Sequence, residues 1–270
     1  MIDKSGFHFT YDGENSKSHK LVVTGVDDYA LPQKKVITYD IDGRDGSLLY
    51  DTKAFENRLV KIQVKLIANS KEEFNAYAED IVRWLQDDVD FKPLILSDNP
   101  NYYFLASCIN KIEISRTLIT IGTATLIFEC KPYKFYCIGD EPRELSEGKT
   151  LIVNPSPYIS HPLIKFVGNA SFIIKVGDQD PVQFEGLVGT EDRPAILDTD
   201  LMDAYRYLES GSVKNLNRFM ISGYWEDLWL PKDSTDVEII KVNGVIDSIT
   251  IDARWRKLWY QYYWVKMKVI

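Results

Sequence analysis

Apolar residues recur with helical spacing in one convincing segment, Ser70–Gln86. Its apolar positions come every three or four residues, which places them on one stripe of an α-helix. Ser70 and Glu73 have the spacing of a capping box, in which the serine hydroxyl accepts from a backbone N–H that has no partner inside the helix. The stripe consists of Phe74, Tyr77, Ala78, Ile81 and Leu85. We therefore predict one helix, with this stripe packed on a sheet.

The segments on both sides of this helix have the alternation of β-strands. In Arg58–Ile67 every second residue is Val, Ile or Leu, and the residues between them are mostly Lys and Gln. Leu118–Cys130 is apolar at nearly every position of its centre, which is typical of a central strand. Further strands are expected at Phe7–Tyr11, His19–Val26, Val36–Ile41, Phe91–Leu96, Tyr102–Asn110 and Lys111–Ser115. The first half is thus predicted to be a half-buried β-sheet or sandwich packed with one helix.

The chain changes character over residues 131–157, which are rich in Gly, Pro and charge, and we place the domain boundary there. The predicted domains are 1–137 and 138–270. In the second, short apolar segments alternate with turn residues, and GDQDP (177–181) and VNGVID (242–247) have the composition of hairpin turns. The segments are Pro162–Phe166, Ala170–Val176, Val182–Val188, Ala195–Asp198, Arg218–Ile221, Val237–Val242 and Ser248–Trp255. They predict a β-sandwich or jelly roll, so the whole chain is expected to be mainly β with one helix.

Two further segments of the second half are less regular. Asp200–Leu208 fits a helical turn, although Tyr205 and Tyr207 favour a strand. Residues 259–268 alternate weakly and would be apolar on both faces as a strand. Such a strand has to be covered on both sides, so we expect it to pack back on the first domain or on a neighbouring subunit.

The composition excludes several classes of protein. The 270 residues carry a net charge of −8, which argues against a nucleic-acid-binding surface, because phosphate contacts require clustered Lys and Arg. The start lacks the apolar run of a signal peptide, and no segment is long enough to span a bilayer. Cys108, Cys130 and Cys137 have no metal-ligand spacing, and they fit small buried thiols in a reducing cytosol.

Motifs for catalysis or metal binding are missing from the sequence. No GxSxG, GxGxxG or P-loop motif occurs, and His8, His19 and His161 are isolated, as structural or surface histidines are. DIDGRDG (40–46) resembles a calcium loop, but Arg44 stands among the ligand positions, so a plain turn is the better interpretation. A glycosidase would need two opposed acids, and nothing pairs the candidates Glu185, Asp198, Asp200, Glu226 and Asp227. We predict no catalytic residues, no metal site and no cofactor.

Aromatic residues are the remaining candidates for recognition. Tyr224, Trp225 and Trp229 lie close together in GYWEDLWLP, where their rings would stack on a saccharide or contact a partner protein. Packing in the core of a sandwich is the alternative for each of them. The sequence leaves both interpretations open.

The order and spacing of several segments, taken together, resemble the distal tail protein (Dit) family of long-tailed phages that infect Gram-positive bacteria. The resemblance covers nearly the whole chain, although the family often has a glycine at the position of Pro155 and a proline-containing loop near Trp225. The segments are GFHFTYDG, IDGRDGSLLYD, NRLVKIQVKLI with EEFNAYAEDIVRWL, IFECKPYKFY, NPSPYISHPLIKFVG, AILDTD and NGVIDSITIDARWRKL.

The resemblance implies a structural protein of the virion that folds in the host cytoplasm and forms a homo-hexameric ring at the tail tip. One face of the ring would meet the tail tube protein and the other the tail-associated lysin or fibre protein. A hairpin arm, with Gly43, Arg44, Asp45 and Gly46 at its turn, would reach a neighbouring subunit. The second domain would be galectin-like and contact a receptor-binding protein or cell-wall saccharide. A carbohydrate-binding adhesion module is the alternative function.

Overall fold

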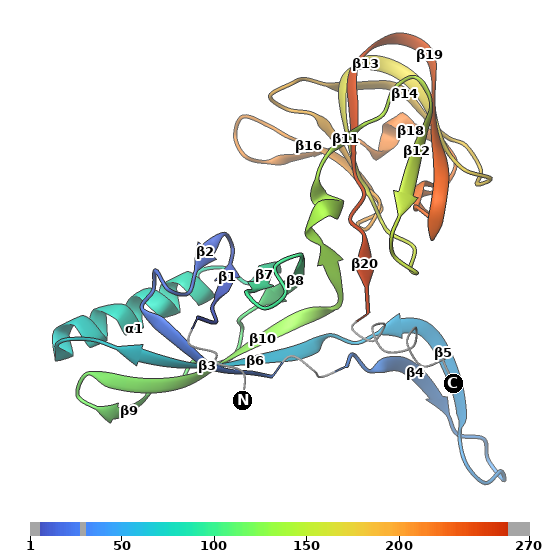
Figure 1. Cartoon of the computed structure of the whole chain (residues 1–270). Coiled ribbons are helices and arrows are strands. Elements are labelled where there is room, and N and C mark those ends of the chain that lie inside the picture. Colours follow the sequence, from blue (N-terminus) through green and yellow to red (C-terminus); the bar gives the residue numbers. More distant parts are fainter. Residues whose placement is uncertain (1–5, 28–30, 259–270) are drawn as a thin grey trace, which may run out of the picture. The chain divides into compact units, whose positions relative to one another are not determined.

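The structure is a computed structural model in which residues 6–27 and 31–258 are described (Figure 1). The chain divides into two compact units after Lys134, and the second unit extends from Phe135 to Lys257. Both consist of antiparallel sheets, and the described residues contain one α-helix. The predicted fold class, mainly β with one helix, is confirmed. The predicted strand over residues 259–268 lies outside the described part of the chain.

The first unit contains a sheet whose strands follow the order β2-β1-β7-β8-β10-β6-β3, with β9 also paired to β10. Alternate residues of β6 are buried, as its sequence predicts, and β6 pairs with β10 over ten consecutive positions. The predicted strand at Lys111–Ser115 is wrong, because the strand there begins only at Ser115. The strands are β1 (Phe9–Tyr11), β2 (Glu14–Asn15), β3 (Leu21–Asp27), β6 (Arg58–Ile67), β7 (Lys92–Leu96), β8 (Tyr102–Ser107), β9 (Ser115–Leu118) and β10 (Ile121–Tyr136).

Helix α1 (Lys71–Gln86) covers this sheet and begins as the sequence predicts. Ser70 is the N-cap, and its hydroxyl accepts from the Glu73 N–H at 3.1 Å. The Glu73 carboxylate accepts from the backbone and side-chain nitrogens of Asn69, both at 3.0 Å. In a capping box it would accept from the N–H of the N-cap residue, Ser70, so the contact is shifted by one residue. Phe74, Ile81 and Leu85 are buried on the sheet, which accounts for the apolar stripe.

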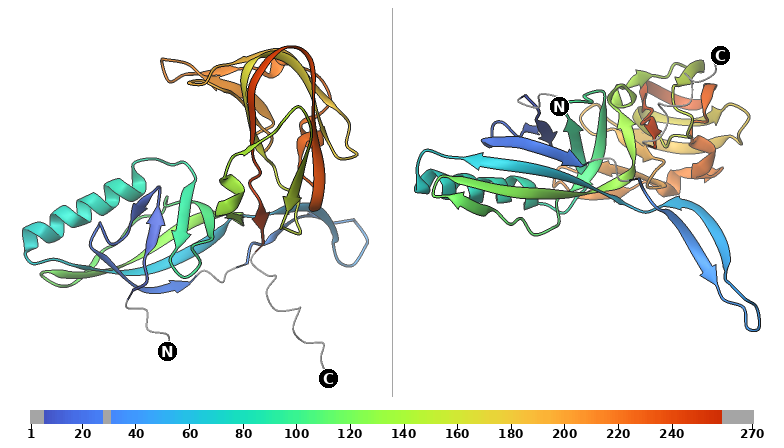
Figure 2. Two further views of the ribbon diagram at one scale, coloured as in Figure 1. Left: turned by 45° about the horizontal axis from the view of Figure 1, so that its top comes forward. Right: turned by 60° about the horizontal axis from the view of Figure 1, so that its bottom comes forward.

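Strands β4 (Lys34–Tyr39) and β5 (Leu48–Phe55) form a two-stranded sheet of their own, here called the arm (Figure 2). Every residue of β4 is exposed, as are most residues of β5. The long exposed hairpin expected around DGRDGS is therefore present.

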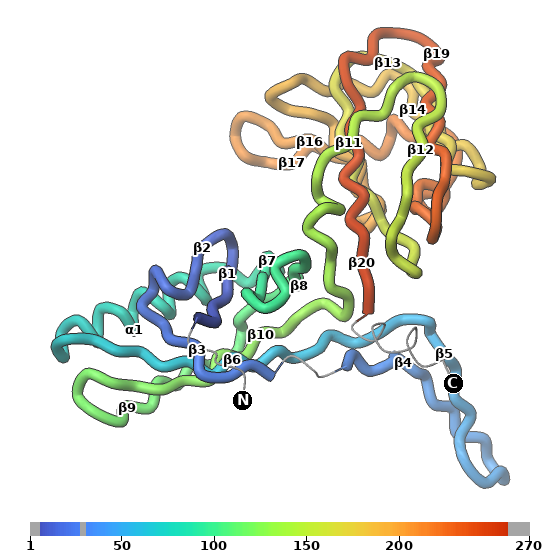
Figure 3. The backbone as a smooth tube through the Cα atoms, viewed as in Figure 1, coloured from blue at the N-terminus to red at the C-terminus, as the bar shows by residue number. Residues whose placement is uncertain are grey.

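The second unit is a β-sandwich built around two long strands, β13 (Leu163–Val176) and β19 (Asp233–Asp252), which pair along the whole of β13 (Figure 3). The first part of β13 pairs with β15 and the later part with β14, while β19 pairs with β12 and then with β11. The other elements are η1 (Cys137–Asp140), β11 (Arg143–Glu144), β12 (Gly148–Asn154), β14 (Val182–Gly189), β15 (Ala195–Asp198), β16 (Asp203–Tyr207), β17 (Val213–Asn215), η2 (Asn217–Phe219), β18 (Met220–Ser222), η3 (Trp225–Leu228) and β20 (Arg256–Lys257).

The two long strands overturn the prediction of a hairpin turn at residues 242–247, because β19 runs through this segment without reversing. The pairing of β13 with β19 shifts register between Val167 and Gly168 and between Ser171 and Phe172, so the pair bends there. Gly244 lies in the bend with φ +83°, and a Cβ on it would lie 2.2 Å from the Asn169 carbonyl oxygen. The glycine therefore marks a close approach between strands.

The core of this unit lies between the layers and contains a row of stacked rings. The centroids of Phe166 and Phe172 are 4.8 Å apart, and those of Phe172 and Phe184 are 5.5 Å apart. The helical turn considered for Asp200–Leu208 is wrong, since Asp203–Tyr207 forms β16. Pairing with β15 supplies hydrogen bonds across the sheet, so the strand preference of Tyr205 prevails.

Candidate assembly interface and ligand site

One face of the arm carries four large apolar side chains. In the antiparallel register Ile37 lies opposite Tyr50 and Tyr39 opposite Leu48, and residues that lie opposite each other share a face. These four side chains are between 41% and 59% exposed. A two-stranded sheet without further partners is marginally stable in water, and an apolar face of this kind marks an interaction surface.

The other face of the arm is mixed. Val36 lies opposite Asp51 and Thr38 opposite Leu49. Lys34 Nζ lies 2.9 Å from Asp51 Oδ2, and this hydrogen bond holds the pKa of the Asp51 carboxyl below its usual value. The two faces therefore differ in chemistry, and the apolar one is the candidate for contact with another protein surface.

The four residues predicted at the subunit interface form the turn of the arm. Gly43 and Gly46 have φ of +78° and +75°, and the Arg44 N–H donates to the Ile41 carbonyl at 3.1 Å. All four are exposed. The apolar face lies on the strands of the arm, and none of its residues was among those predicted. The alternation of Ile37 and Tyr39 was visible in the sequence. That they share a face with Leu48 and Tyr50 follows only from the register of the hairpin.

The predicted aromatic residues lie on or beside η3, but their surroundings differ. Tyr224 is 73% exposed. Trp225 packs against the core, with its ring centroid 6.4 Å from that of Phe184. Trp229 stacks on His161 with centroids 4.4 Å apart, and its indole N–H donates to the Thr199 carbonyl at 3.2 Å. Only Tyr224 among the three therefore presents most of its surface to solvent.

His161 belongs to a structural cluster. Its Nδ1 lies 2.7 Å from Asp200 Oδ1, and its Nε2 lies 3.0 Å from Arg256 Nη2. The imidazole thus links two segments that are distant in the sequence.

Asp198 and Asp227, two of the acids considered for glycoside hydrolysis, have structural partners. Asp198 Oδ1 accepts from the backbone N–H groups of Asp200 and Leu201 and lies 3.0 Å from Arg254 Nη1. Asp227 Oδ2 accepts from the Tyr224 N–H at 3.0 Å. Among the described residues no group of three His, Cys, Asp or Glu side chains is placed to hold a metal ion.

The three cysteines contrast in burial. Burial raises the pKa of the Cys130 thiol to about 12 and that of Cys108 to about 11, so both are protonated, unreactive thiols at neutral pH. The thiol of Cys137 is half-buried, and its pKa is raised as well. In the described parts of the chain, no helix has the length and apolar character needed to cross a membrane.

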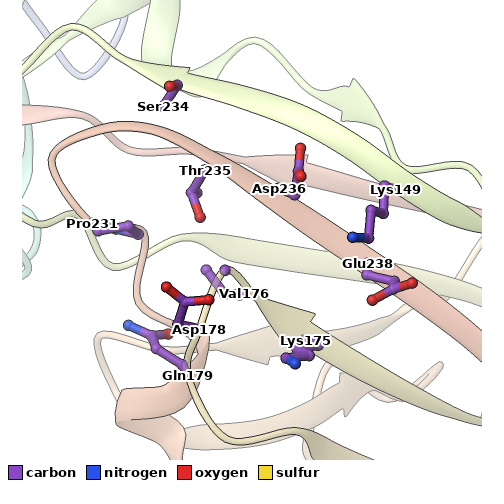
Figure 4. A pocket seen from close by; sticks show the side chains of 11 residues that line it. Lys149, Lys175, Val176, Asp178, Gln179, Pro231, Ser234, Thr235, Asp236 and Glu238 are labelled. Carbon is purple, nitrogen blue, oxygen red and sulfur yellow. The ribbon is translucent and has the colours of Figure 1, made fainter.

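The second unit also carries a polar hollow of about 660 Å³ between β12, the turn after β13 and the first part of β19 (Figure 4). Lys149, Glu238 and Lys175 line one side, and Asp178 and Gln179 line the other. None of these residues was predicted as a site, because each is an ordinary surface residue type in the sequence. Their proximity depends on strand pairing.

Comparison with known proteins agrees with the architecture. Residues 4–132 match a family model described as the phage tail protein N-terminal domain. No curated protein sequence matches the chain. Among solved structures, the Dit protein (gp 19.1) of phage SPP1, described as a paradigm of the hub adsorption apparatus in phages infecting Gram-positive bacteria, matches with a TM-score of 0.63 at 16% identity. That match covers 91% of this chain and 96% of the SPP1 chain.

Two structures of the phage p2 baseplate in its activated conformation, one with strontium and one with calcium, contain chains that match with a TM-score of 0.52 at 10% identity. These matches have the same coverage of both chains. At such identities the solved structures establish a shared fold, and the family match shows what the first unit is similar to. Residues 4–132 therefore match the phage tail protein N-terminal domain family, and the chain shares the fold of the SPP1 Dit protein.

Proposed function

We propose that this protein is the hub at the distal end of a long non-contractile phage tail and has no catalytic role. In this proposal its copies form a hexameric ring that joins the tail tube protein to the tail-associated lysin or fibre protein and to proteins that recognise the host. The likeness in fold to the SPP1 Dit protein supports the proposal. The observation that carries it is the arm, whose apolar face is unsuited to a protein that works alone.

A closed ring requires heterologous contacts, in which one surface of a subunit meets a different surface of the next. The arm supplies such a surface, because it projects Ile37, Tyr39, Leu48 and Tyr50 from a single face. Full burial of a large apolar side chain stabilises an interface by about 1.5–3 kcal/mol, so four of them contribute several kcal/mol. In this proposal the apolar face packs on a neighbouring subunit, and the turn at Gly43–Gly46 reaches beyond it.

The net charge of −8 suits a ring through which DNA passes, since a surface that repels phosphate does not retain it. The second unit would then carry the contacts to a receptor-binding protein or to saccharide. We assign no role in stacking on sugars to Trp225 or Trp229, because their contacts are with the unit itself.

The decisive experiment measures molar mass by light scattering over a range of concentrations. We expect the wild-type chain to reach the mass of a hexamer and Tyr39→Lys to remain smaller, because a lysine in the apolar face would have to be desolvated at the interface. The matched control is Thr38→Lys, which places the same charge on the opposite face of the same strand and should leave the mass unchanged. A wild-type chain that stays monomeric at high concentration, or two variants that behave alike, would refute the proposed role of the arm.

A further inference from the structure

We infer that the first unit carries a second apolar surface, at the tip of the hairpin between β9 and β10, and that this surface receives the arm of another copy of the chain. The inference rests on the proposed hub and names the surface that the arm meets, which the hub by itself leaves open. Four observations support it: the exposure of the hairpin tip, the contacts that hold the tip in place, its position relative to the arm, and the charges around both surfaces.

Large apolar side chains are exposed at the tip of this hairpin and on the strands beside it. Leu118 lies opposite Ile121, and Ile121 lies opposite Ile67, so these side chains form a row across one face of β9, β10 and β6. Val22 on β3 lies on the same face, one strand further along. The hairpin patch is the name used here for Val22, Ile67, Leu118 and Ile119, which are between 47% and 67% exposed.

The turn of the hairpin has no local reason to be apolar. It consists of Ile119 and Thr120, whereas hairpin turns of two residues favour Gly, Asn and Asp because of their backbone conformations. A β-branched side chain that is exposed in such a turn does not stabilise the turn itself. An exposed apolar cluster of this kind marks a contact with another surface.

The hairpin patch is held in place by contacts within the first unit. The Ala68 N–H donates to the Thr120 carbonyl at 2.9 Å, which ties the turn of the hairpin to the residue after β6. Arg116 Nη2 donates to Asn75 Oδ1 on α1 at 2.6 Å, and the same guanidinium lies over the ring of Phe74, 4.6 Å from its centroid. A surface that is ordered before binding loses little conformational entropy on association, which favours its use as a docking surface.

The arm and the hairpin patch lie at opposite ends of β6. The arm leads into β6 at Arg58, whereas Ile67 is its last residue, and a strand of ten residues is about 30 Å long. Figure 1 shows β4 and β5 at one end of the first unit and β9 at the other. A ring needs two different surfaces on each subunit, one for the subunit before it and one for the subunit after it. The two apolar surfaces are placed as such a pair.

The charges beside the two apolar surfaces are complementary. The turn of the arm, residues 40–46, contains three aspartates and one arginine, so its net charge is −2. Beside the hairpin patch the cations are Lys65, which lies opposite Val22, and Lys20, which comes directly before β3. Attraction between the acidic turn and these lysines would orient the arm while its apolar face covers the hairpin patch. Another copy of the chain therefore supplies both the apolar face and the negative charge that the hairpin patch requires.

The first part of the test measures the molar mass of full-length variants by light scattering. We expect Leu118→Lys to stay below the mass of the wild-type hexamer, because the lysine would have to be desolvated under the arm of the next subunit. Val89→Lys is the matched control, since it replaces another apolar residue, 77% exposed, in the segment after α1. This control should assemble as the wild type does. Circular dichroism checks that both variants are folded.

The second part identifies what covers the hairpin patch. A chain with both Leu48→Cys and Leu118→Cys is treated with a short bismaleimide, and we expect a ladder of cross-linked products up to the hexamer on a denaturing gel. The control pairs Leu118→Cys with Leu49→Cys, because Leu49 lies on the other face of the arm, and it should give much less product. The wild-type chain measures the background from its own cysteines, and each single variant measures contacts between identical positions.

The outcomes separate this inference from the proposed hub. A hexamer that forms undiminished with Leu118→Lys, or equal cross-linking through positions 48 and 49, would overturn the inference and leave the hub as proposed. A wild-type chain that stays monomeric would overturn the hub and the inference together.

Discussion

The imidazole of His19 lies flat on the indole of Trp84, with ring centroids 4.0 Å apart and planes inclined by 8°. Phe9 stacks on Trp84 as well, at 5.6 Å, and the indole N–H donates to the Tyr11 carbonyl at 3.2 Å. His19 Nδ1 lies 2.7 Å from Asp80 Oδ2 on the helix, and Nε2 lies 3.0 Å from Glu14 Oε2. The first strands of the chain are thereby fastened to the last turns of α1.

This arrangement predicts that His19→Ala lowers the free energy of unfolding of the first unit. The stack and the hydrogen bonds to two partly exposed carboxylates are lost together, and we expect a loss of about 1–2 kcal/mol. Urea unfolding followed by circular dichroism measures the change. His8→Ala is the control, because that ring makes an exposed contact with the Gly6 carbonyl, and it should change the stability by less than about 0.5 kcal/mol. Equal effects of the two variants would contradict the role given to the stack.

The bend of β19 predicts a large difference between two glycines that both have positive φ. Gly244→Ala forces a Cβ to within 2.2 Å of the Asn169 oxygen, and we expect the second unit to lose roughly 3–5 kcal/mol or fail to fold. Gly211→Ala has a similar φ of +77° but meets no atom within 4 Å, so a loss of about 1–2 kcal/mol is expected from the backbone alone. The same unfolding measurement compares the two. A loss for Gly244→Ala no larger than that for Gly211→Ala would show that the strands are not closely packed there.

The position of Tyr205 leads us to predict how the stability of the second unit changes at high pH. Burial, followed by the nearby charge of Asp198, raises the pKa of its phenol to about 12, whereas in the unfolded chain it is about 10. The protonated phenol therefore contributes stability that is fully present below about pH 10 and is lost as the pH rises towards 12. We expect Tyr205→Phe to reduce the fall in the guanidinium midpoint between pH 9 and pH 11.5. Tyr224→Phe, which changes an exposed ring, is the control; a fall that is the same in the wild type and in Tyr205→Phe would contradict the prediction.

Features governed by neighbours in the sequence were predictable. The helix at Ser70–Gln86, its serine cap and the alternating burial of β6 follow from interactions within a few residues, and the structure confirms them. The reciprocal contact of Glu73 was predicted less well, since its carboxylate reaches Asn69 instead of Ser70. A shift by one residue lies within the freedom of a flexible side chain, which local spacing does not restrict.

The sequence by itself determined that the chain is mainly β with one helix and carries an exposed hairpin, because periodicity and turn residues act locally. Only the tertiary structure decided that β13 and β19 continue through glycines that resembled turns, that Trp225 and Trp229 pack on their own unit, and that Lys149, Glu238 and Lys175 form one row. Each of these depends on the register between strands that are distant in the sequence. A change of register by one residue moves every side chain of a strand to the other face, and no local pattern specifies it.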